Sequence, residues 1–231
     1  MARAIGIVAE SAEGAALCYQ TICREAPLAM GDYAHPEILM HNYPLSQYMA
    51  LFEAGDWQGV ARMLLTSVGK LAQGGADFAI MPCNTLHQAL PDVMRESPIP
   101  WIHIAEPIAE EARRKNHRCL GILGTSYLMD GPVYRDILDP LDLAWQVPDP
   151  EDRKRVDEII FDELVNNIFK EESRLTFNAV MQRMKQAGCD AVVLGCTEIP
   201  LLVDPDDTPL PVLDSTRLLA RAALQRAIQA D

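Results

Sequence analysis

Hydrophobic and polar positions follow two alternating patterns along the chain. Short apolar runs, which predict strands, are separated by longer stretches with hydrophobic residues at helical spacing. Phe78–Met81 and Ala191–Leu194 contain no polar residue, as expected of strands buried on both faces of a parallel sheet. The other runs that predict strands are Ala4–Val8, Glu37–His41, Trp101–Ile102, Cys119–Leu123 and Leu210–Val212.

The longer stretches predict helices. In one of them Val156, Ile159, Ile160 and Leu164 recur at helical spacing, with acidic residues between them. The predicted helices cover Gly14–Ala26, Trp57–Gln73, Pro107–Lys115, Asp152–Ile168, Ser173–Gln186 and Ser215–Gln229. Because strands and helices alternate in this way, we expect an α/β fold with mostly parallel sheets.

The sequence also contains an internal repeat. Residues 75–85 (GADFAIMPCNT) resemble residues 188–198 (GCDAVVLGCTE), and residues 3–8 (RAIGIV) resemble residues 118–123 (RCLGIL). The two offsets are nearly equal, 196 − 83 = 113 and 121 − 6 = 115 residues. We therefore predict two similar α/β domains, one formed by residues 1–98 plus 208–231 and the other by residues 99–207.

Composition narrows the class of protein. The 231 residues are 49% hydrophobic, which favours a folded chain, and the net charge is −13. An acidic chain is a poor partner for nucleic acid or an anionic membrane. The first apolar run is too short for a signal peptide, and no run approaches the roughly 18 residues of a membrane span. We expect a cytoplasmic protein whose thiols are free.

Six cysteines remain to be explained, and none has CxxC or zinc-ligand spacing. We expect four of them to be small core residues: Cys18, Cys23, Cys119 and Cys189. Cys83 and Cys196 differ, because each follows a buried strand and precedes hydroxyl or amide residues. Ligands of parallel α/β sheets bind at the carboxyl ends of the strands. The two thiols are therefore candidate catalytic groups.

Two thiols on opposite sides of one cavity suit a proton transfer at carbon. One thiolate removes a proton from one face, and the other thiol returns a proton to the opposite face. Asn84, Thr85 and Thr197, with the backbone N–H groups beside them, can hold a substrate carboxylate, or they are turn and cap residues. Glu198 either caps its helix or contacts the substrate amine, and we favour His87 as a supporting residue over a Cys–His pair.

These segments resemble the paired signatures of the aspartate/glutamate racemase family. The matching residues are Cys83-Asn84-Thr85-Leu86-His87 and Gly195-Cys196-Thr197-Glu198-Ile199, with weaker likeness at His35-Pro36-Glu37, Leu123-Gly124-Thr125 and residues 159–164. The resemblance implies two pseudo-symmetric three-layer αβα domains with the active site in the cleft between them. It also implies a catalytic Cys83–Cys196 pair, no pyridoxal phosphate or other cofactor, a small amino acid or carboxylate as substrate, and a homodimer.

Other positions bear on the substrate. Ser11 lies in a loop, Ala9–Gly14, that lines the site in relatives, but here the loop also carries Glu10 and Glu13. Thr125 lies in a glycine-containing segment, residues 121–126, that leads from a predicted strand into a turn and can contact a carboxylate. Arg155 is either the partner of a distal substrate carboxylate or ordinary helix-surface charge. The five histidines form no metal triad in the sequence, so we expect no metal site.

The leading interpretation is a racemase of aspartate, glutamate or both. One alternative is an enzyme of the same fold, such as a hydantoin racemase, a maleate isomerase or an arylmalonate decarboxylase relative. Another is a catalytically silent protein that binds small carboxylates. The two matched thiols argue against a silent binder, which has no need of them.

Overall fold

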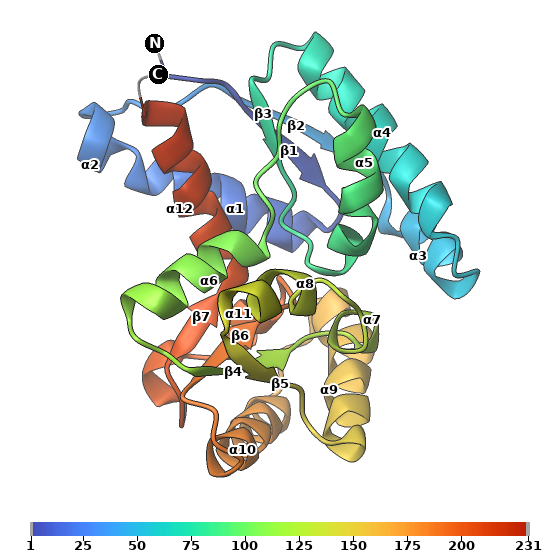
Figure 1. The fold of residues 1–231 in the computed structure, drawn as a ribbon, viewed down its shortest axis with the longest axis vertical. Coiled ribbons are helices and arrows are strands. Elements are labelled where there is room, and N and C mark those ends of the chain that lie inside the picture. The colour runs from blue at the N-terminus through green and yellow to red at the C-terminus, as the bar shows by residue number, and fades with distance from the viewer. Residues whose placement is uncertain (1, 230–231) are drawn as a thin grey trace. The chain divides into compact units, whose positions relative to one another are not determined.

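A computed structural model describes residues 2–229 of the chain. The chain divides into two compact units, drawn in Figure 1. Among the described residues, unit 1 contains residues 2–104 and 216–229, and unit 2 contains residues 105–215. The division into folding domains at residues 98 and 208 remains a prediction.

Unit 1 is built on a parallel sheet in the order β2-β1-β3. The strands are β1 (Ile5–Ala9), β2 (Ile38–Asn42) and β3 (Phe78–Ile80). All of β1 and β3 is buried, because helices cover the sheet. The helices of this unit are α1 (Ala12–Glu25), α2 (Pro27–Met30), α3 (Leu45–Glu53), α4 (Trp57–Gln73), α5 (Leu90–Glu96) and α12 (Ser215–Ile228).

Unit 2 is built on a parallel sheet in the order β5-β4-β6-β7. The strands are β4 (Cys119–Leu123), β5 (Ala144–Gln146), β6 (Ala191–Leu194) and β7 (Val212–Asp214). The helices are α6 (Ala105–Arg114), α7 (Ser126–Met129), α8 (Arg135–Leu138), α9 (Pro150–Asp162), α10 (Glu171–Gln186) and α11 (Ile199–Leu202). Apolar faces of α9 and α10 pack on one side of this sheet around Ile160 and Phe177.

The two units share a strand plan that matches the sequence repeat. In each unit the first strand lies between the second strand and the strand that leads to a candidate cysteine. Gly6 of β1 faces Ala79 of β3, and Gly121 of β4 faces Val192 of β6. These pairs are related by the same offsets, 115 and 113 residues, that relate the two sequence segments. The expected α/β fold with parallel sheets is therefore confirmed.

Two aspartates anchor the repeated segments in the same way. The Asp77 carboxylate accepts the N–H of Ala4, and the Asp190 carboxylate accepts the N–H groups of Arg118 and Cys119. Each aspartate lies just after a helix and just before a buried strand. This contact ties the start of β1 to the start of β3, and the start of β4 to the start of β6.

The glycines at the ends of α4 and α10 are also equivalent. Gly75 and Gly188 both adopt φ of 102°, a left-handed conformation that favours glycine. Each reverses the chain after a long helix, two residues before one of the anchoring aspartates. The repeat is thus preserved in backbone conformation as well as in sequence.

Most predicted elements are confirmed, with shifts of a few residues at their ends. The predicted helix Asp152–Ile168 is wrong in length, because α9 ends at Asp162. Asn167 then turns the chain with φ of 59°. Trp101–Ile102 forms only an isolated bridge to Ala79 rather than a strand. The short strand β5 was not predicted, because its three residues are only partly buried and lack a strong apolar run.

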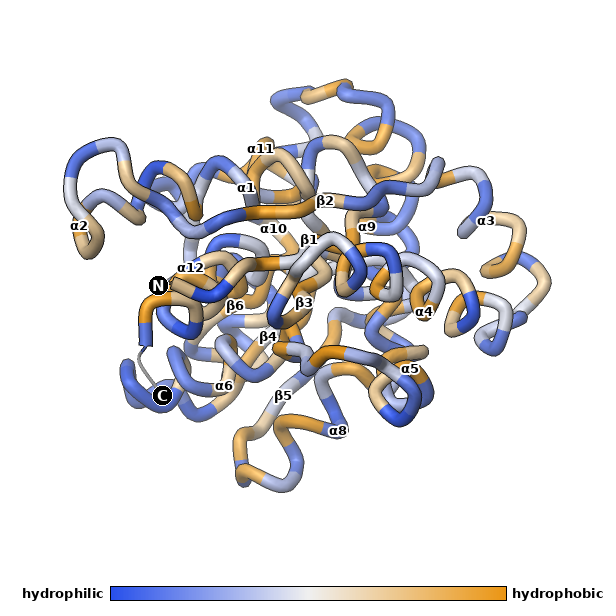
Figure 2. The backbone as a smooth tube through the Cα atoms, turned by 90° about the horizontal axis from the view of Figure 1, so that it is seen from above, coloured by the Kyte–Doolittle hydropathy of each residue, from blue (hydrophilic) through white to orange (hydrophobic). Residues whose placement is uncertain are grey.

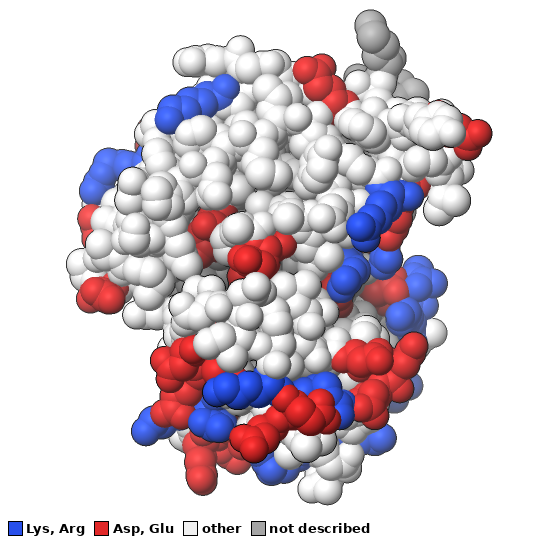
Figure 3. All heavy atoms as spheres, turned by 180° about the vertical axis from the view of Figure 1, so that it is seen from behind, with Lys and Arg blue, Asp and Glu red and all other residues white. Residues whose placement is uncertain are grey.

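Surface character agrees with the amphipathic pattern of the sequence. Figure 2 shows hydrophobic and hydrophilic residues alternating along the helices. On the face drawn in Figure 3, acidic and basic side chains are interleaved rather than gathered into a basic patch. Within the described residues, none of the helices combines the length and the apolar character needed to cross a bilayer.

Candidate functional site

Cys83 follows β3 in unit 1 and is almost completely buried. Its backbone N–H donates to the Met81 carbonyl at 2.8 Å, which turns the chain directly after the strand. Asn84 and Thr85 follow and are also buried, and Thr85 begins a short 3-10 helix, Thr85–Ala89. The Asn84 side chain does not cap this helix.

His87 fixes the backbone of the Cys83 loop. Its Nε2 accepts the N–H of Ile104 at 3.1 Å, so the ring proton resides on Nδ1, which donates to the Cys83 carbonyl at 2.8 Å. Burial and the neighbouring His103 hold the pKa of His87 well below its usual value. His87 is thus a neutral residue that contacts the backbone of Cys83, as a supporting role requires.

Ser11 lies at the same edge of the sheet in unit 1. It follows β1, which is the direct neighbour of β3, and both strands run in the same direction. Its Oγ accepts the N–H of Gly14 at 3.2 Å and so caps α1. The structure gives Ser11 a capping role and places it beside the end of the strand that leads to Cys83.

Cys196 follows β6 in unit 2 after the single residue Gly195. Its Sγ donates to Glu198 Oε2 at 2.9 Å, and the Thr197 hydroxyl donates to the same oxygen at 2.8 Å. Glu198 is 4% exposed and its side chain does not cap α11. The buried carboxylate therefore accepts hydrogen bonds from both the partly exposed thiol and the threonine hydroxyl. The structure does not bear out the capping role expected of Glu198, and contact with a substrate amine remains a prediction.

Close backbone packing holds Cys196 in place. The Gly195 N–H donates to the Leu123 carbonyl at 2.6 Å, across the ends of β4 and β6. A Cβ added to Gly195 would lie 2.8 Å from that oxygen, so no larger residue fits without displacement. Thr125 follows β4 at the same edge, and its side chain accepts the N–H of Leu128 at 3.3 Å, capping α7.

Arg155 lies on α9, with its side chain 53% exposed. Its Nη1 lies 3.6 Å from Glu158 Oε2, three residues further along the same helix. Such exposed pairs contribute little to stability. The structure therefore shows Arg155 as helix-surface charge, and its expected role toward a distal carboxylate remains a prediction.

Tyr48, which the sequence pattern does not single out, carries a buried hydroxyl near Cys83. It lies on α3, is completely buried, and its hydroxyl has no hydrogen-bond partner among the described residues. Burial raises the pKa of this hydroxyl, and the nearby acidic groups Cys83 and Glu10 raise it further. A single tyrosine within an apolar helix gives no sequence signal beyond that of a core residue.

The four cysteines expected to be core residues differ in burial. Cys18 and Cys189 are buried, and Cys119 is partly exposed but packs against the core of unit 2; the expectation is wrong for Cys23, which is partly exposed. Cys189 and Cys119 place their sulfur atoms 3.8 Å apart near the start of β4. Burial raises the pKa of the Cys189 thiol to about 12, with Cys119 adding to the effect. These thiols lie at the end of the sheet opposite to Cys196.

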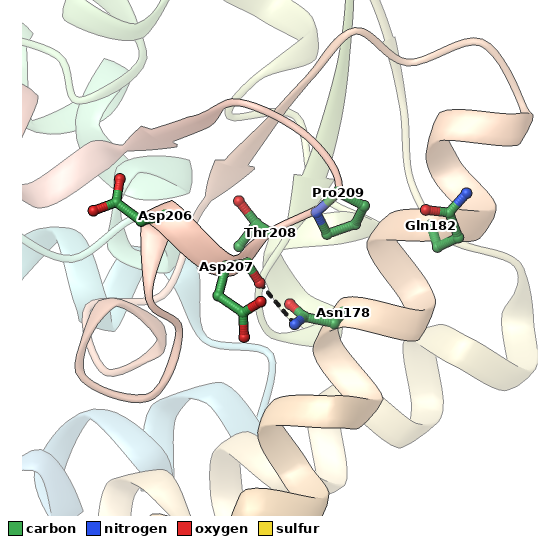
Figure 4. Close-up of a pocket in the computed structure, with 6 residues that line it drawn as sticks. All are labelled: Asn178, Gln182, Asp206, Asp207, Thr208 and Pro209. Carbon is green, nitrogen blue, oxygen red and sulfur yellow. Dashed lines mark hydrogen bonds between the residues drawn. The ribbon is translucent and has the colours of Figure 1, made fainter.

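Two surface hollows are lined by residues that include neither Cys83 nor Cys196. One hollow of about 370 Å³ in unit 2 lies between α10 and residues 206–209, where Asn178 Nδ2 donates to the Asp207 carbonyl at 2.9 Å (Figure 4). Another, of about 380 Å³ in unit 1, lies between α3 and α4. Across residues 2–229, no three His, Cys, Asp or Glu side chains are grouped so as to hold a metal ion.

Comparison with known proteins gives a consistent result. Residues 7–223 match the family model described as Asp/Glu/hydantoin racemase. A crystal structure from Yersinia pestis assigned to the Asp/Glu racemases is 30% identical, with a TM-score of 0.90, and the match covers 98% of this chain and 100% of that one. An aspartate racemase homologue from Pyrococcus horikoshii OT3 is 26% identical, with a TM-score of 0.84, over 99% and 100% of the two chains.

A curated relative extends the same likeness at lower identity. The broad specificity amino-acid racemase RacX from Bacillus subtilis (strain 168) is 19% identical over 202 residues, which are 87% of this chain and 86% of the relative. The family match spans both units and both cysteine segments described above. The chain therefore belongs to the Asp/Glu/hydantoin racemase family.

Proposed function

We propose that the protein is a cofactor-independent amino-acid racemase that interconverts the L and D forms of a small amino acid, with aspartate and glutamate as the first candidates. The observation that carries this proposal is the matched position of Cys83 and Cys196. Each thiol follows the equivalent strand of its own unit, Cys83 three residues after the end of β3 and Cys196 two residues after the end of β6. Membership of a racemase family supports it.

The proposed reaction needs only the two thiols to move protons. One cysteine, as thiolate, takes the α-proton from one face of the substrate and becomes a thiol. The electron pair left on the α-carbon is delocalised into the α-carboxylate. The other cysteine, as thiol, gives its proton to the opposite face and becomes a thiolate. Protons and electrons balance, and no electron sink such as pyridoxal phosphate is required.

The groups beside the cysteines supply the remaining requirements. Charge develops on the α-carboxylate in the transition state, and preorganised donors that face it lower the barrier. Asn84 and Thr85 follow Cys83, and Thr197 follows Cys196. We assign these residues and their backbone N–H groups to the carboxylate. We assign to Glu198 the uptake of the Cys196 proton, because its carboxylate accepts the hydrogen of that thiol.

Cysteine replacement tests the proposal. Wild type is incubated with L- and D-aspartate, glutamate and neutral amino acids, and optical rotation is followed. Cys83→Ala and Cys196→Ala should each lower the racemisation rate by about 10²–10⁴-fold, the usual contribution of a general acid–base group. Cys23→Ala, on the outer part of α1, is the matched control and should keep the wild-type rate. Full activity in either site variant would contradict the two-thiol mechanism.

A second candidate, a hydantoin racemase, is favoured by one observation. Glu10 lies close enough to Tyr48 for its charge to act on that hydroxyl. A carboxylate at this position disfavours a second one on the substrate, whereas a hydantoin carries no carboxylate. The substrate panel therefore includes 5-substituted hydantoins and maleate. Turnover of a hydantoin without turnover of any amino acid would select this candidate.

A further inference from the structure

The hydroxyl of Tyr48 lies in an unusual environment for a polar group. The residue is completely buried, and its Oη has no hydrogen-bond partner among residues 2–229. A buried polar atom without a partner has lost its hydrogen bonds to water and gained none in return, so phenylalanine would suit a purely structural position better. The hydroxyl therefore points to a partner that arrives with a ligand.

The surroundings of Tyr48 are those of the candidate site. Parallel strands of unit 1 lie in the order β2-β1-β3, and the segments that leave their carboxyl ends carry Tyr48, Glu10 and Cys83 in that order. Cys83 and Glu10 act electrostatically on the Tyr48 hydroxyl, as does Tyr43. One edge of one sheet thus brings a thiol, a carboxylate and a phenol together.

The chemistry of these neighbours decides what Tyr48 can do. Burial and the nearby acidic groups keep the phenol protonated, so it acts as a hydrogen-bond donor. Tyr43 already accepts a hydrogen bond from Lys70 at 3.2 Å. An oxygen acceptor on the ligand would satisfy the Tyr48 donor.

The position of Tyr48 indicates which part of the ligand this acceptor belongs to. Asn84 and Thr85 continue from Cys83 into the 3-10 helix, and the proposed function assigns them to the α-carboxylate. Tyr48 follows β2, which lies on the opposite side of β1 from β3. With the α-carbon at Cys83, the group that extends toward β2 is the side chain of the substrate.

We propose that Tyr48 is a specificity-determining residue, whose phenol O–H donates to an oxygen at the end of the substrate side chain, in an amide or a carboxylate. The nearby carboxylate of Glu10 favours the amide. This proposal rests on the proposed function, because it places the α-carbon at Cys83. It assigns to Tyr48 the discrimination between substrates that carry such an oxygen and substrates that lack it.

Tyr48→Phe removes the hydroxyl and nothing else. Racemisation of aspartate, asparagine and alanine is measured for wild type and variant, and binding of the same three compounds is measured by calorimetry. Aspartate and asparagine carry the side-chain oxygen and alanine does not. In the variant, the ratio of kcat/KM for the preferred oxygen-bearing substrate to kcat/KM for alanine should fall about tenfold, because one hydrogen bond to the substrate is lost.

Folding stability gives a second readout that separates this role from a structural one. Tyr134 is a buried tyrosine of unit 2 whose hydroxyl is hydrogen-bonded to Ser215. Tyr134→Phe should lower the unfolding midpoint in urea. Tyr48→Phe should leave the midpoint unchanged or raise it, because its hydroxyl has no partner to lose.

The outcomes are distinct. An unchanged substrate ratio together with unchanged relative binding, or a loss of stability in Tyr48→Phe equal to that in Tyr134→Phe, would overturn the role of Tyr48. A wild-type protein that racemises none of the substrates would instead contradict the proposed function. If Tyr48→Phe still reduces the difference in binding between aspartate or asparagine and alanine, the assignment of Tyr48 stands.

Discussion

The thiol of Cys196 and the carboxylate of Glu198 are joined by a hydrogen bond of 2.9 Å inside the loop that follows β6. The same carboxylate oxygen accepts the Thr197 hydroxyl, so two donors orient it. Glu198 is almost fully buried, and a buried carboxylate must be paired. Cys196 is therefore held beside an acid that can take up its proton, and Cys83 lies beside a phenol.

Glu198→Gln tests this relationship. The amide keeps the shape and can still accept the thiol hydrogen, but it cannot take a proton. We expect kcat to fall about tenfold or more, with a small change in KM, and we expect the pH dependence of kcat to lose one limb. A pH–rate profile identical to that of wild type would show that Glu198 only positions the loop. Glu158→Gln, on the exposed surface of α9, is the control.

His87→Ala should destabilise the protein. The variant leaves the Cys83 carbonyl and the Ile104 N–H unpaired in a buried region and adds a cavity, so we expect a loss of about 2–5 kcal/mol in the free energy of unfolding. Urea denaturation measures it. His35→Ala, at an exposed position, should change the free energy by less than about 0.5 kcal/mol. An equal, small effect of both substitutions would refute the anchoring role.

The depressed pKa of His87 predicts how stability depends on pH. The unfolded chain binds a proton to this histidine near pH 6.5, whereas the folded protein keeps it neutral to well below that value. The contribution of neutral His87 to the free energy of unfolding is fully present above pH 6.5. It is lost as the pH falls from there toward the pKa of His87 in the folded protein. The free energy of unfolding should therefore decrease below pH 6.5. His87→Gln should reduce that slope, and an unchanged slope would argue against a neutral His87.

Gly195→Ala and Gly69→Ala should have opposite effects. A Cβ at Gly195 would approach the Leu123 carbonyl to 2.8 Å, so we expect a loss of about 1–3 kcal/mol and reduced activity, because Cys196 follows directly. A Cβ at Gly69, inside α4, meets no atom within 4 Å and should stabilise the helix by about 0.5–1 kcal/mol. Thermal unfolding and the racemisation assay measure both. Equal effects would refute close packing at Gly195.

Much of the fold could be predicted from the sequence, because each buried strand is a short apolar run flanked by amphipathic helices. The strands Cys119–Leu123 and Ala191–Leu194 and the helix Trp57–Gln73 were predicted to the residue. The repeat predicted the common strand plan of the two units. Short elements such as β5 and α3 could not be predicted, because tertiary contacts rather than a local pattern stabilise them.

The candidate site could be predicted only in part. Cys83 and Cys196 could be found because each follows a short apolar run, and the two runs occupy equivalent positions in the repeated segments. The pairing of Glu198 with Cys196 could not be predicted, since nothing in Cys196-Thr197-Glu198 says that the glutamate turns back rather than caps α11. Tyr48 could not be singled out either, because only the fold brings its hydroxyl near Glu10 and Cys83, which are distant in sequence.

The central claim is that two thiols move two different protons, and isotope exchange in deuterated water tests it most directly. The enzyme is mixed with one pure enantiomer of its substrate, and α-deuterium is measured early in the reaction in both enantiomers by NMR and mass spectrometry. The account predicts one deuterium in the newly formed enantiomer, almost none in the remaining starting enantiomer, and the same result from the opposite enantiomer. Equal deuterium in both enantiomers, or product that retains its original proton, would indicate a single base and contradict the account.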